Sequence, residues 1–201
     1  MIRYQHLTRE FVPGVVALQR TCFPEPFPAE LLWQAAHLEN HLRLFSEGQF
    51  IALDGGQVIA SCTNMLISNL NWDMHLPWEV QTGGLTLSKH NPNGETLYGI
   101  DISVHPDYRG QGIGRTLYHM RYDLVRSHHL TRYGTVCRMP DFAATGMTDA
   151  GEFAAAVARG EKTDRTLTPL LKMGLHFGGI IPNYMADAES GNAGAILSWQ
   201  P

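Results

Sequence analysis

The sequence predicts an α/β fold with a mixed sheet and flanking helices, formed as one domain over residues 1–201. Three observations support this prediction. Short apolar runs typical of strands alternate along the chain with segments of helical period. No internal repeat or low-complexity tract is present, and no linker separates two cores. With 201 residues, 44% of them hydrophobic, the chain can build one sizeable core.

The first half of the chain predicts one strand, two helices and a β-hairpin. Residues 2–7 alternate apolar and polar side chains, as a strand does. Apolar residues then recur every three or four positions in two segments, and the second begins at Pro28, a residue suited to the first turn of a helix. An Asp-Gly-Gly sequence between two strand-like runs indicates the hairpin. The predicted helices cover 11–22 and 28–45, and the predicted hairpin strands cover 49–53 and 57–67.

Residues 68–96 interrupt this pattern. Asparagine, glycine, threonine and tryptophan dominate there, and a long irregular stretch inside a compact domain is usually functional or disordered. Trp72 and Trp78 argue against disorder, because large aromatic side chains tend to pack. We expect an elaborated loop or short hairpin near the functional site. Trp72, Trp78, His90 and Asn91 would line an acceptor pocket or, equally, form a satellite core.

The second half alternates strands with helices. Residues 96–104 form a nearly continuous apolar run, typical of a central strand covered on both faces. A glycine turn separates this strand from an amphipathic helix that reaches about Ser127. Asp149 and Glu152 then form a capping-box pattern before a helix, and Gly174 ends a short one. The remaining predicted strands are 135–139, 178–181 and 195–199.

Composition limits the classes of partner. The chain carries 15 basic and 19 acidic residues, a net charge of −4, which disfavours general nucleic-acid binding. No apolar run approaches the ~20 residues of a membrane span, and the N-terminus lacks the apolar core of a secretory signal. Three cysteines, far apart and odd in number, favour reduced thiols in a cytoplasmic protein. The sequence leaves the oligomeric state open between a monomer and a homodimer.

Two local clusters could hold an ion. Between positions 105 and 140, six arginines accompany two acids, a local charge of +4. This concentration around one glycine turn suggests a bound small anion, although a solvated basic helix face explains it equally well. His37 and His41 lie four apart on a predicted helix and could share a metal ion. No third ligand is evident, so we predict a polar helix face and no metal site.

The strongest functional signal is Val-His-Pro-Asp-Tyr-Arg-Gly-Gln-Gly-Ile-Gly-Arg at 104–115. Its three glycines let backbone N–H groups turn inward, and the next helix adds its unpaired first-turn N–H groups and positive dipole end. Together these make a phosphate socket, to which Arg109 and Arg115 can add charge. The pattern is neither a P-loop nor a dinucleotide fingerprint. A turn that only allows tight packing of strand on helix is the structural alternative.

The stretch Arg-Gly-Gln-Gly-Ile-Gly at 109–114 resembles the acetyl-CoA motif [QR]-x-x-G-x-[GA] of the GCN5-related N-acetyltransferases, the GNAT family. The order of predicted elements also matches that family along nearly the whole chain. A narrower resemblance is to the acetyltransferase-type domain attached to some bacterial carbon–nitrogen hydrolases. The residues that carry it are 90–104, 138–142 and 178–192.

The resemblance implies an enzyme that transfers the acetyl group of acetyl-CoA to an amine, most simply of a small molecule, by direct attack on the thioester. The end of the strand would pair with the pantetheine arm, and the turn would hold the pyrophosphate. The alternative is a module that binds acetyl-CoA without transferring the group. The cofactor-binding residues implied are Ile102, Ser103, Val104, Arg109, Gly110, Gln111, Gly112, Ile113, Gly114 and Arg115.

Three residues are candidates for proton transfer. Asp101 is an acid in an otherwise apolar strand, where burial would raise its pKa toward the range of a useful base, but it could also be a structural carboxylate. Tyr98 occupies a position where some relatives carry a base and is expected to shape the acceptor pocket. Many relatives place a tyrosine general acid where this chain has Leu170, which also favours the binding module. Tyr184 is the candidate substitute, unless it is only a packed tyrosine.

Overall fold

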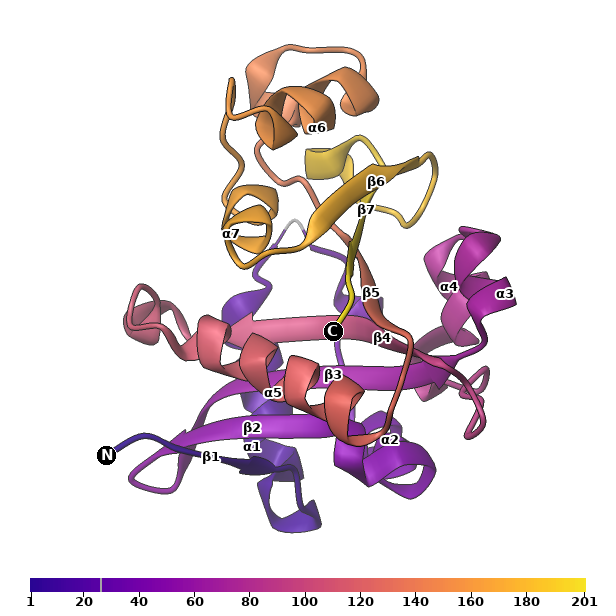
Figure 1. Cartoon of the computed structure of the whole chain (residues 1–201). Helices are drawn as coiled ribbons and strands as arrows, with labels where there is room; N and C mark the ends of the chain where they lie inside the picture. Colours follow the sequence, from indigo (N-terminus) through magenta and orange to yellow (C-terminus); the bar gives the residue numbers. More distant parts are fainter. Residues whose placement is uncertain (26) are drawn as a thin grey trace.

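The computed structural model describes residues 1–25 and 27–201, which fold around one mixed sheet (Figure 1). The spatial order of its strands is β1-β2-β3-β4-β5-β7-β6. Strands β4 and β5 run parallel, and the other neighbouring pairs are antiparallel. The predicted α/β class is confirmed. The strands are β1 (Arg3–His6), β2 (Gln49–Asp54), β3 (Gln57–Ile67), β4 (Thr96–Val104), β5 (Arg132–Cys137), β6 (His176–Ile181) and β7 (Gly194–Trp199).

Helices cover both faces of the sheet. α1 (Val12–Cys22) and α2 (Ala35–Phe45) contribute to one buried cluster with β2 and β3, and α1 lies behind the strands in Figure 1. α5 (Ile113–Ser127) crosses the opposite face, in front of the strands. There it shares the main core with α6 (Ala150–Ala158) and α7 (Leu167–Lys172). The first residues of β4 are therefore buried from both sides, as their continuous apolar run predicts.

The second helix begins later than the sequence predicts. After Pro28 the chain makes only a single 3-10 turn, Ala29–Leu31. α2 starts at Ala35, where Gln34 is the N-cap and its backbone N–H donates to Nδ1 of His37 at 3.2 Å. A reciprocal cap between Gln34 and His37 therefore starts this helix, and the proline does not.

Residues 68–96 fold as two short helices, α3 (Asn69–Asp73) and α4 (Trp78–Thr82), and not as the loop or hairpin that we expected. The Ser68 hydroxyl caps α3 by accepting a first-turn N–H at 3.1 Å. Gly83 ends α4 with a φ of 72°. The polar and glycine-rich composition thus supplies helix caps.

Strand β4 carries two irregularities that shape the site. Thr63 of β3 pairs with Asp101, but the next residue pairs with Gly99, so Ile100 is an extra residue, a β-bulge. Pairing between β4 and β5 runs from Thr96 as far as Gly99, and the described residues form no further pair between these strands. The two parallel strands therefore diverge after Gly99, and the β5-facing backbone of 100–104 has no strand partner.

Candidate functional site

The glycine turn at 109–115 leads directly into α5. Gly110 and Gly112 have φ of 76° and 80°, in the left-handed region that glycine adopts without strain. A Cβ at either position would meet no atom within 4 Å, so backbone conformation and not packing requires these glycines. Gly112 is the N-cap of α5, which leaves the first-turn N–H groups of the helix free beside the turn. This geometry fits an anion.

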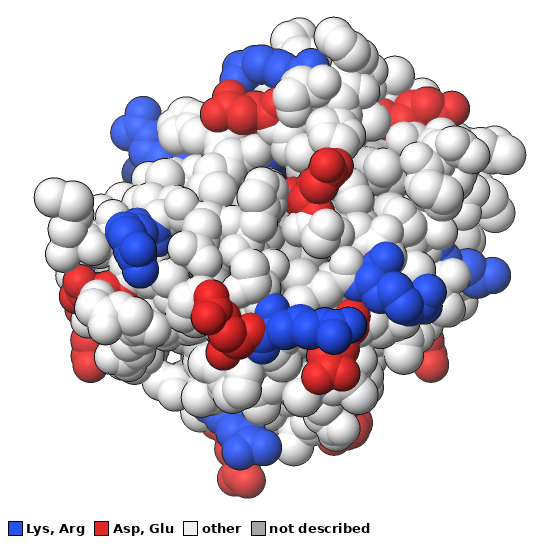
Figure 2. Space-filling model, turned by 90° about the horizontal axis from the view of Figure 1, so that it is seen from below, with Lys and Arg blue, Asp and Glu red and all other residues white. Residues whose placement is uncertain are grey.

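The side chains of the turn differ in what they offer a ligand. Arg109 is exposed, and its Nε donates to the carbonyl of Val104 at 3.1 Å, which ties the turn to the end of β4. Gln111 and Arg115 are also exposed. Ile113 is buried in the core and offers only backbone. On the face drawn in Figure 2, basic and acidic side chains are interspersed.

The strand residues implied for the pantetheine arm lie beyond the bulge. Ile102 and Val104 pack toward the main core on the α5 side. Ser103 faces the other side, where its hydroxyl accepts Nε2 of Gln19 from α1 at 3.0 Å. The side chains are thus engaged on both faces of the sheet, and the unpaired backbone edge remains available to an extended ligand.

A cavity of about 190 Å³ opens where β4 and β5 diverge. Its walls come from α1 and the segment before α2, from α4, α5 and α7, and from the connection between β6 and β7. Ile100, Asp101 and Ile102 line it from β4. A second hollow of about 340 Å³ lies beside α1 and the β2–β3 hairpin and contains none of the predicted site residues. We therefore place the chemistry in the first cavity.

Asp101 lines this cavity and is held from the α1 side of the sheet. Its Oδ2 accepts Nε2 of Gln19 at 2.9 Å and the hydroxyl of Ser103 at 3.1 Å. Burial raises the pKa of Asp101 to about 6, although these hydrogen bonds and Arg121 act to lower it. The indole N–H of Trp33 approaches the same carboxyl without a hydrogen bond of normal geometry. The carboxyl can therefore exchange a proton near neutral pH.

Tyr98 and Tyr184 are brought together from distant parts of the chain. Their hydroxyl oxygens lie 2.9 Å apart, and either can be the donor. Tyr184 lines the cavity, whereas Tyr98 lies behind it in a buried cluster. Burial raises the pKa of both tyrosines well above the ordinary value, so both stay protonated at neutral pH. A hydroxyl donor, and not a base, is what this pair offers.

The 68–96 segment contributes one side chain to the cavity. Trp78 lines it, and its backbone N–H donates to the carbonyl of Tyr184 at 2.8 Å. Trp72 instead packs in the core against Gly134. His90 stacks on a phenylalanine ring at 5.2 Å and accepts the N–H of Leu66, so it serves the fold.

The polar side chains at the cavity that sequence reasoning missed include Gln19, Arg121 and Arg138. One signal for Arg121 was present. It falls at a spacing of four on the apolar stripe of α5, whose neighbours Leu117 and Val125 are buried. A charged residue on the apolar face of an amphipathic helix is buried together with that face. Gln19 and Arg138 carry no comparable signal.

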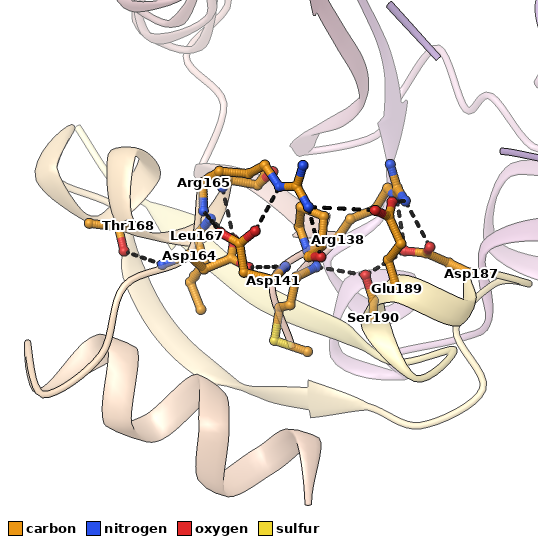
Figure 3. A network of polar contacts seen from close by, with 12 residues as sticks. Arg138, Asp141, Asp164, Arg165, Leu167, Thr168, Asp187, Glu189 and Ser190 are labelled. Carbon is orange, nitrogen blue, oxygen red and sulfur yellow. Dashed lines mark hydrogen bonds and ion pairs between the residues drawn. The ribbon is translucent and has the colours of Figure 1, made fainter. Parts of the chain in front are cut away.

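Arg138 belongs to a network of ion pairs beside the cavity (Figure 3). Its guanidinium donates twice to Asp187, at 2.7 Å each, and once to Glu189, at 2.8 Å. Arg165 pairs with Asp141 at 2.8 Å and reaches Glu189 at 3.5 Å. The segment after β5, the loop before α7 and the β6–β7 connection are thereby joined, and the charge of Arg138 is compensated.

Comparisons with known proteins agree with this geometry. The sequence profile described as acetyltransferase (GNAT) family matches residues 12–150. This chain is a member of the GNAT family. The predicted resemblance is therefore confirmed, and the protein is an acyltransferase of the GNAT type with a CoA-based co-substrate. The glycine turn and the free edge of β4 both fit such a molecule.

Individual relatives of this GNAT protein are similar over nearly its whole length. In Bacillus subtilis, a protein named uncharacterized N-acetyltransferase YkwB is 34% identical over 98% of this chain and 87% of its own. A second B. subtilis protein, named probable hydrolase YhcX, is 35% identical over 97% of this chain, which spans only 38% of that relative. The solved GphF GNAT-like decarboxylase in complex with isobutyryl-CoA has a TM-score of 0.81 at 21% identity, covering 98% of both chains.

Two further features concern metals and membranes. Within residues 1–25 and 27–201, no three histidine, cysteine or acidic side chains lie together as a metal site would require. His41 is buried with its Nε2 2.7 Å from the carbonyl of Leu85, and His37 caps α2. No helix formed by the described residues is long and apolar enough to cross a membrane.

Proposed function

We propose that this chain transfers an acetyl group from acetyl-CoA to the amine of a small-molecule acceptor. The cavity where β4 and β5 diverge carries this proposal, because it joins an unpaired strand edge to a buried, titratable carboxyl. The edge at 102–104 suits the amides of pantetheine, and the N–H groups of 109–115 suit the diphosphate. The thioester then lies at the bulge, beside Asp101.

Asp101 is the general base in this proposal. An alkylammonium must lose a proton before it can attack, and a base with a pKa of about 6 is mostly ionised at neutral pH. Gln19 and Ser103 hold one carboxyl oxygen, which orients the group toward the cavity. The bulge at Ile100 is what turns Asp101 to this face of the strand.

Tyr184 is the proposed proton donor to the leaving thiolate. Leu170, at the position of the usual tyrosine, lines the same cavity but has no proton to give. The hydroxyl of Tyr98 can donate to Tyr184, which leaves the Tyr184 proton free to face the cavity. Burial keeps that proton in place at neutral pH, as a general acid requires.

The walls of the cavity favour an acceptor with an apolar body. Four aromatic side chains line the cavity: Phe23, Phe27, Trp33 and Trp78. Among the described lining residues, the acidic one is Asp101. Aromatic walls around one carboxyl suit a small alkyl or aryl amine, whose ammonium group can pair with the carboxylate before proton transfer.

A second candidate is an acyl-CoA-binding module that does not transfer the group. Leu170 favours it, because it removes the usual acid from the cavity. The hydroxyls of Tyr98 and Tyr184 also bond to each other, which is the arrangement of packed structural tyrosines. This chain matches only 38% of the length of a relative named as a probable hydrolase, which is consistent with an acyl-CoA-binding domain that accompanies a separate catalytic domain in that relative.

Thiol release separates the two candidates. The protein is incubated with acetyl-CoA and a panel of small amines, and free CoA thiol is measured over time. Acceptor-dependent release that saturates with amine supports the transferase. Tight acetyl-CoA binding without release from any amine supports the module, and no binding contradicts both.

A further inference from the structure

Arg121 is a fully buried cation at the wall of the cavity. It projects from α5 toward the bulge of β4 and is 1% exposed. Its Nη2 donates to the carbonyl of Asp101 at 2.6 Å and approaches that of Thr63 at 3.4 Å. The rings of Tyr118 and Tyr133 lie 4.9 and 5.3 Å from its central carbon. The side chain is therefore held in one position.

No carboxylate compensates this charge directly. Within residues 1–25 and 27–201, Arg121 forms no ion pair with an acidic oxygen within 4.0 Å, and its Nε has no hydrogen-bond partner. Burial raises the pKa of the neighbouring Tyr118, Tyr133 and Cys62, so none of them is an anion at neutral pH. The carboxylate of Asp101 attracts Arg121 electrostatically but does not contact it, because its Oδ2 accepts hydrogen bonds from Gln19 and Ser103 on the α1 side of the sheet.

Arg138, the other arginine at the cavity, has its positive charge compensated by carboxylates of this chain. Arg138 donates to both carboxylate oxygens of Asp187 and to Glu189 (Figure 3). A guanidinium left unpaired in a buried site is strongly unfavourable unless another group supplies the negative charge. Among the described residues, Arg138 has two carboxylates in direct contact and Arg121 has none, so the guanidinium of Arg121 can pair directly with an anion carried by a ligand.

The diphosphate cannot be that anion. Arg121 follows Gly112 by nine residues on α5, which places it roughly 13 Å along the helix from the turn. The ligand atoms that reach the cavity at this depth are those near the thioester. A negative charge there belongs to the acyl group.

We propose that Arg121 binds a carboxylate at the far end of the acyl group, so that the preferred donor is the CoA thioester of a short dicarboxylic acid. This proposal rests on the acyl transfer to an amine proposed above, and it replaces acetyl-CoA by a carboxylated acyl-CoA as the preferred donor. The planar guanidinium suits a carboxylate, and the free Nε supplies a donor for it. An arginine that only braces the carbonyls of the bulge would make no distinction between charged and neutral acyl groups.

Calorimetric titration of the whole chain tests this with three probes: CoA, malonyl-CoA and acetoacetyl-CoA. The last two have acyl groups of equal length and similar shape, and differ in a carboxylate oxygen against a methyl group. We expect malonyl-CoA to bind at least about tenfold more tightly than acetoacetyl-CoA, the size of one charge-assisted hydrogen bond. Arg121→Gln should bring this ratio close to one.

Arg126→Gln is the matched control. Arg126 lies on the same helix but is exposed and pairs with Asp123 at 3.0 Å, so its loss should leave the ratio unchanged. If wild-type protein binds the two esters equally, the inference is wrong, and this result needs no variant. If CoA itself does not bind, the proposed function fails as well, which distinguishes the two failures. A ratio that falls equally in both variants would also overturn the role of Arg121.

Discussion

The glycine turn and the cavity between β4 and β5 are built in different ways. The turn is made of consecutive, mostly exposed residues, and two of its glycines, Gly110 and Gly112, are required by backbone conformation alone. The cavity takes side chains from helices, strands and connections far apart in the chain, and its polar groups are held by partners from other elements. We therefore expect changes at the turn to affect affinity for CoA, and changes in the cavity to affect turnover.

The largest effect is expected for Asp101→Asn. Loss of the proposed base should lower kcat at least about 100-fold and leave CoA affinity unchanged, because the carboxyl is held toward α1 and away from the turn. In the wild type, kcat/KM should rise with pH through about 6, as the carboxyl ionises, and this limb should be absent in the variant. Thiol release measured across pH 5 to 8 checks both. Unchanged turnover would remove Asp101 from the role of base.

Gly112→Val should act on affinity. A β-branched residue at a φ of 80° is strained and would displace the N–H groups of the turn, so CoA should bind about 30- to 100-fold more weakly. Gly160→Val is the control, since Gly160 has a φ of 78° and equally open surroundings but lies at the end of α6. Calorimetry on both variants separates a lost site from general strain, and equal losses would contradict the site.

Tyr184→Phe should reduce kcat about tenfold without changing CoA affinity, because one hydrogen bond to the developing thiolate is lost. Tyr98→Phe removes the other hydroxyl of the pair but leaves that of Tyr184 beside the cavity, so its effect on kcat should be smaller. Steady-state rates with a responsive amine make the comparison. A larger loss in the Tyr98 variant would reverse the assignment.

The smallest effect concerns stability. Because the pKa of Asp101 is raised in the folded state, its contribution favours folding below about pH 4 and is lost as the pH rises through about 6. Asp101→Asn should therefore match the wild type near pH 4 and exceed its free energy of unfolding at pH 8 by about 1–3 kcal/mol. Urea unfolding at the two pH values tests this. A variant that is less stable at pH 8 would show that the carboxylate is a net stabilising group.

Several features of the fold could be predicted because their signals are local. β4 and α5 lie at the predicted residues, and the hairpin turn and the glycine turn are where their residue types indicate. The start of α2 and the two helices within 68–96 were not predicted correctly. In both segments a side-chain cap starts the helix: Gln34 caps α2 and Ser68 caps α3. Polar residues of this kind are equally common in loops, so the sequence alone does not show which of them is a cap.

The candidate site divides along the same line. Sequence was sufficient to propose a phosphate-binding turn, since neighbouring residues alone set its backbone and its charge. The positions of Asp101, Tyr184 and Arg121 depend on the folded chain. The bulge at Ile100 changes which face the following side chains take, and the partners of these residues lie on elements that only packing brings near. Burial and the lack of a carboxylate partner are properties of such packing, so no short stretch of residues could have revealed them.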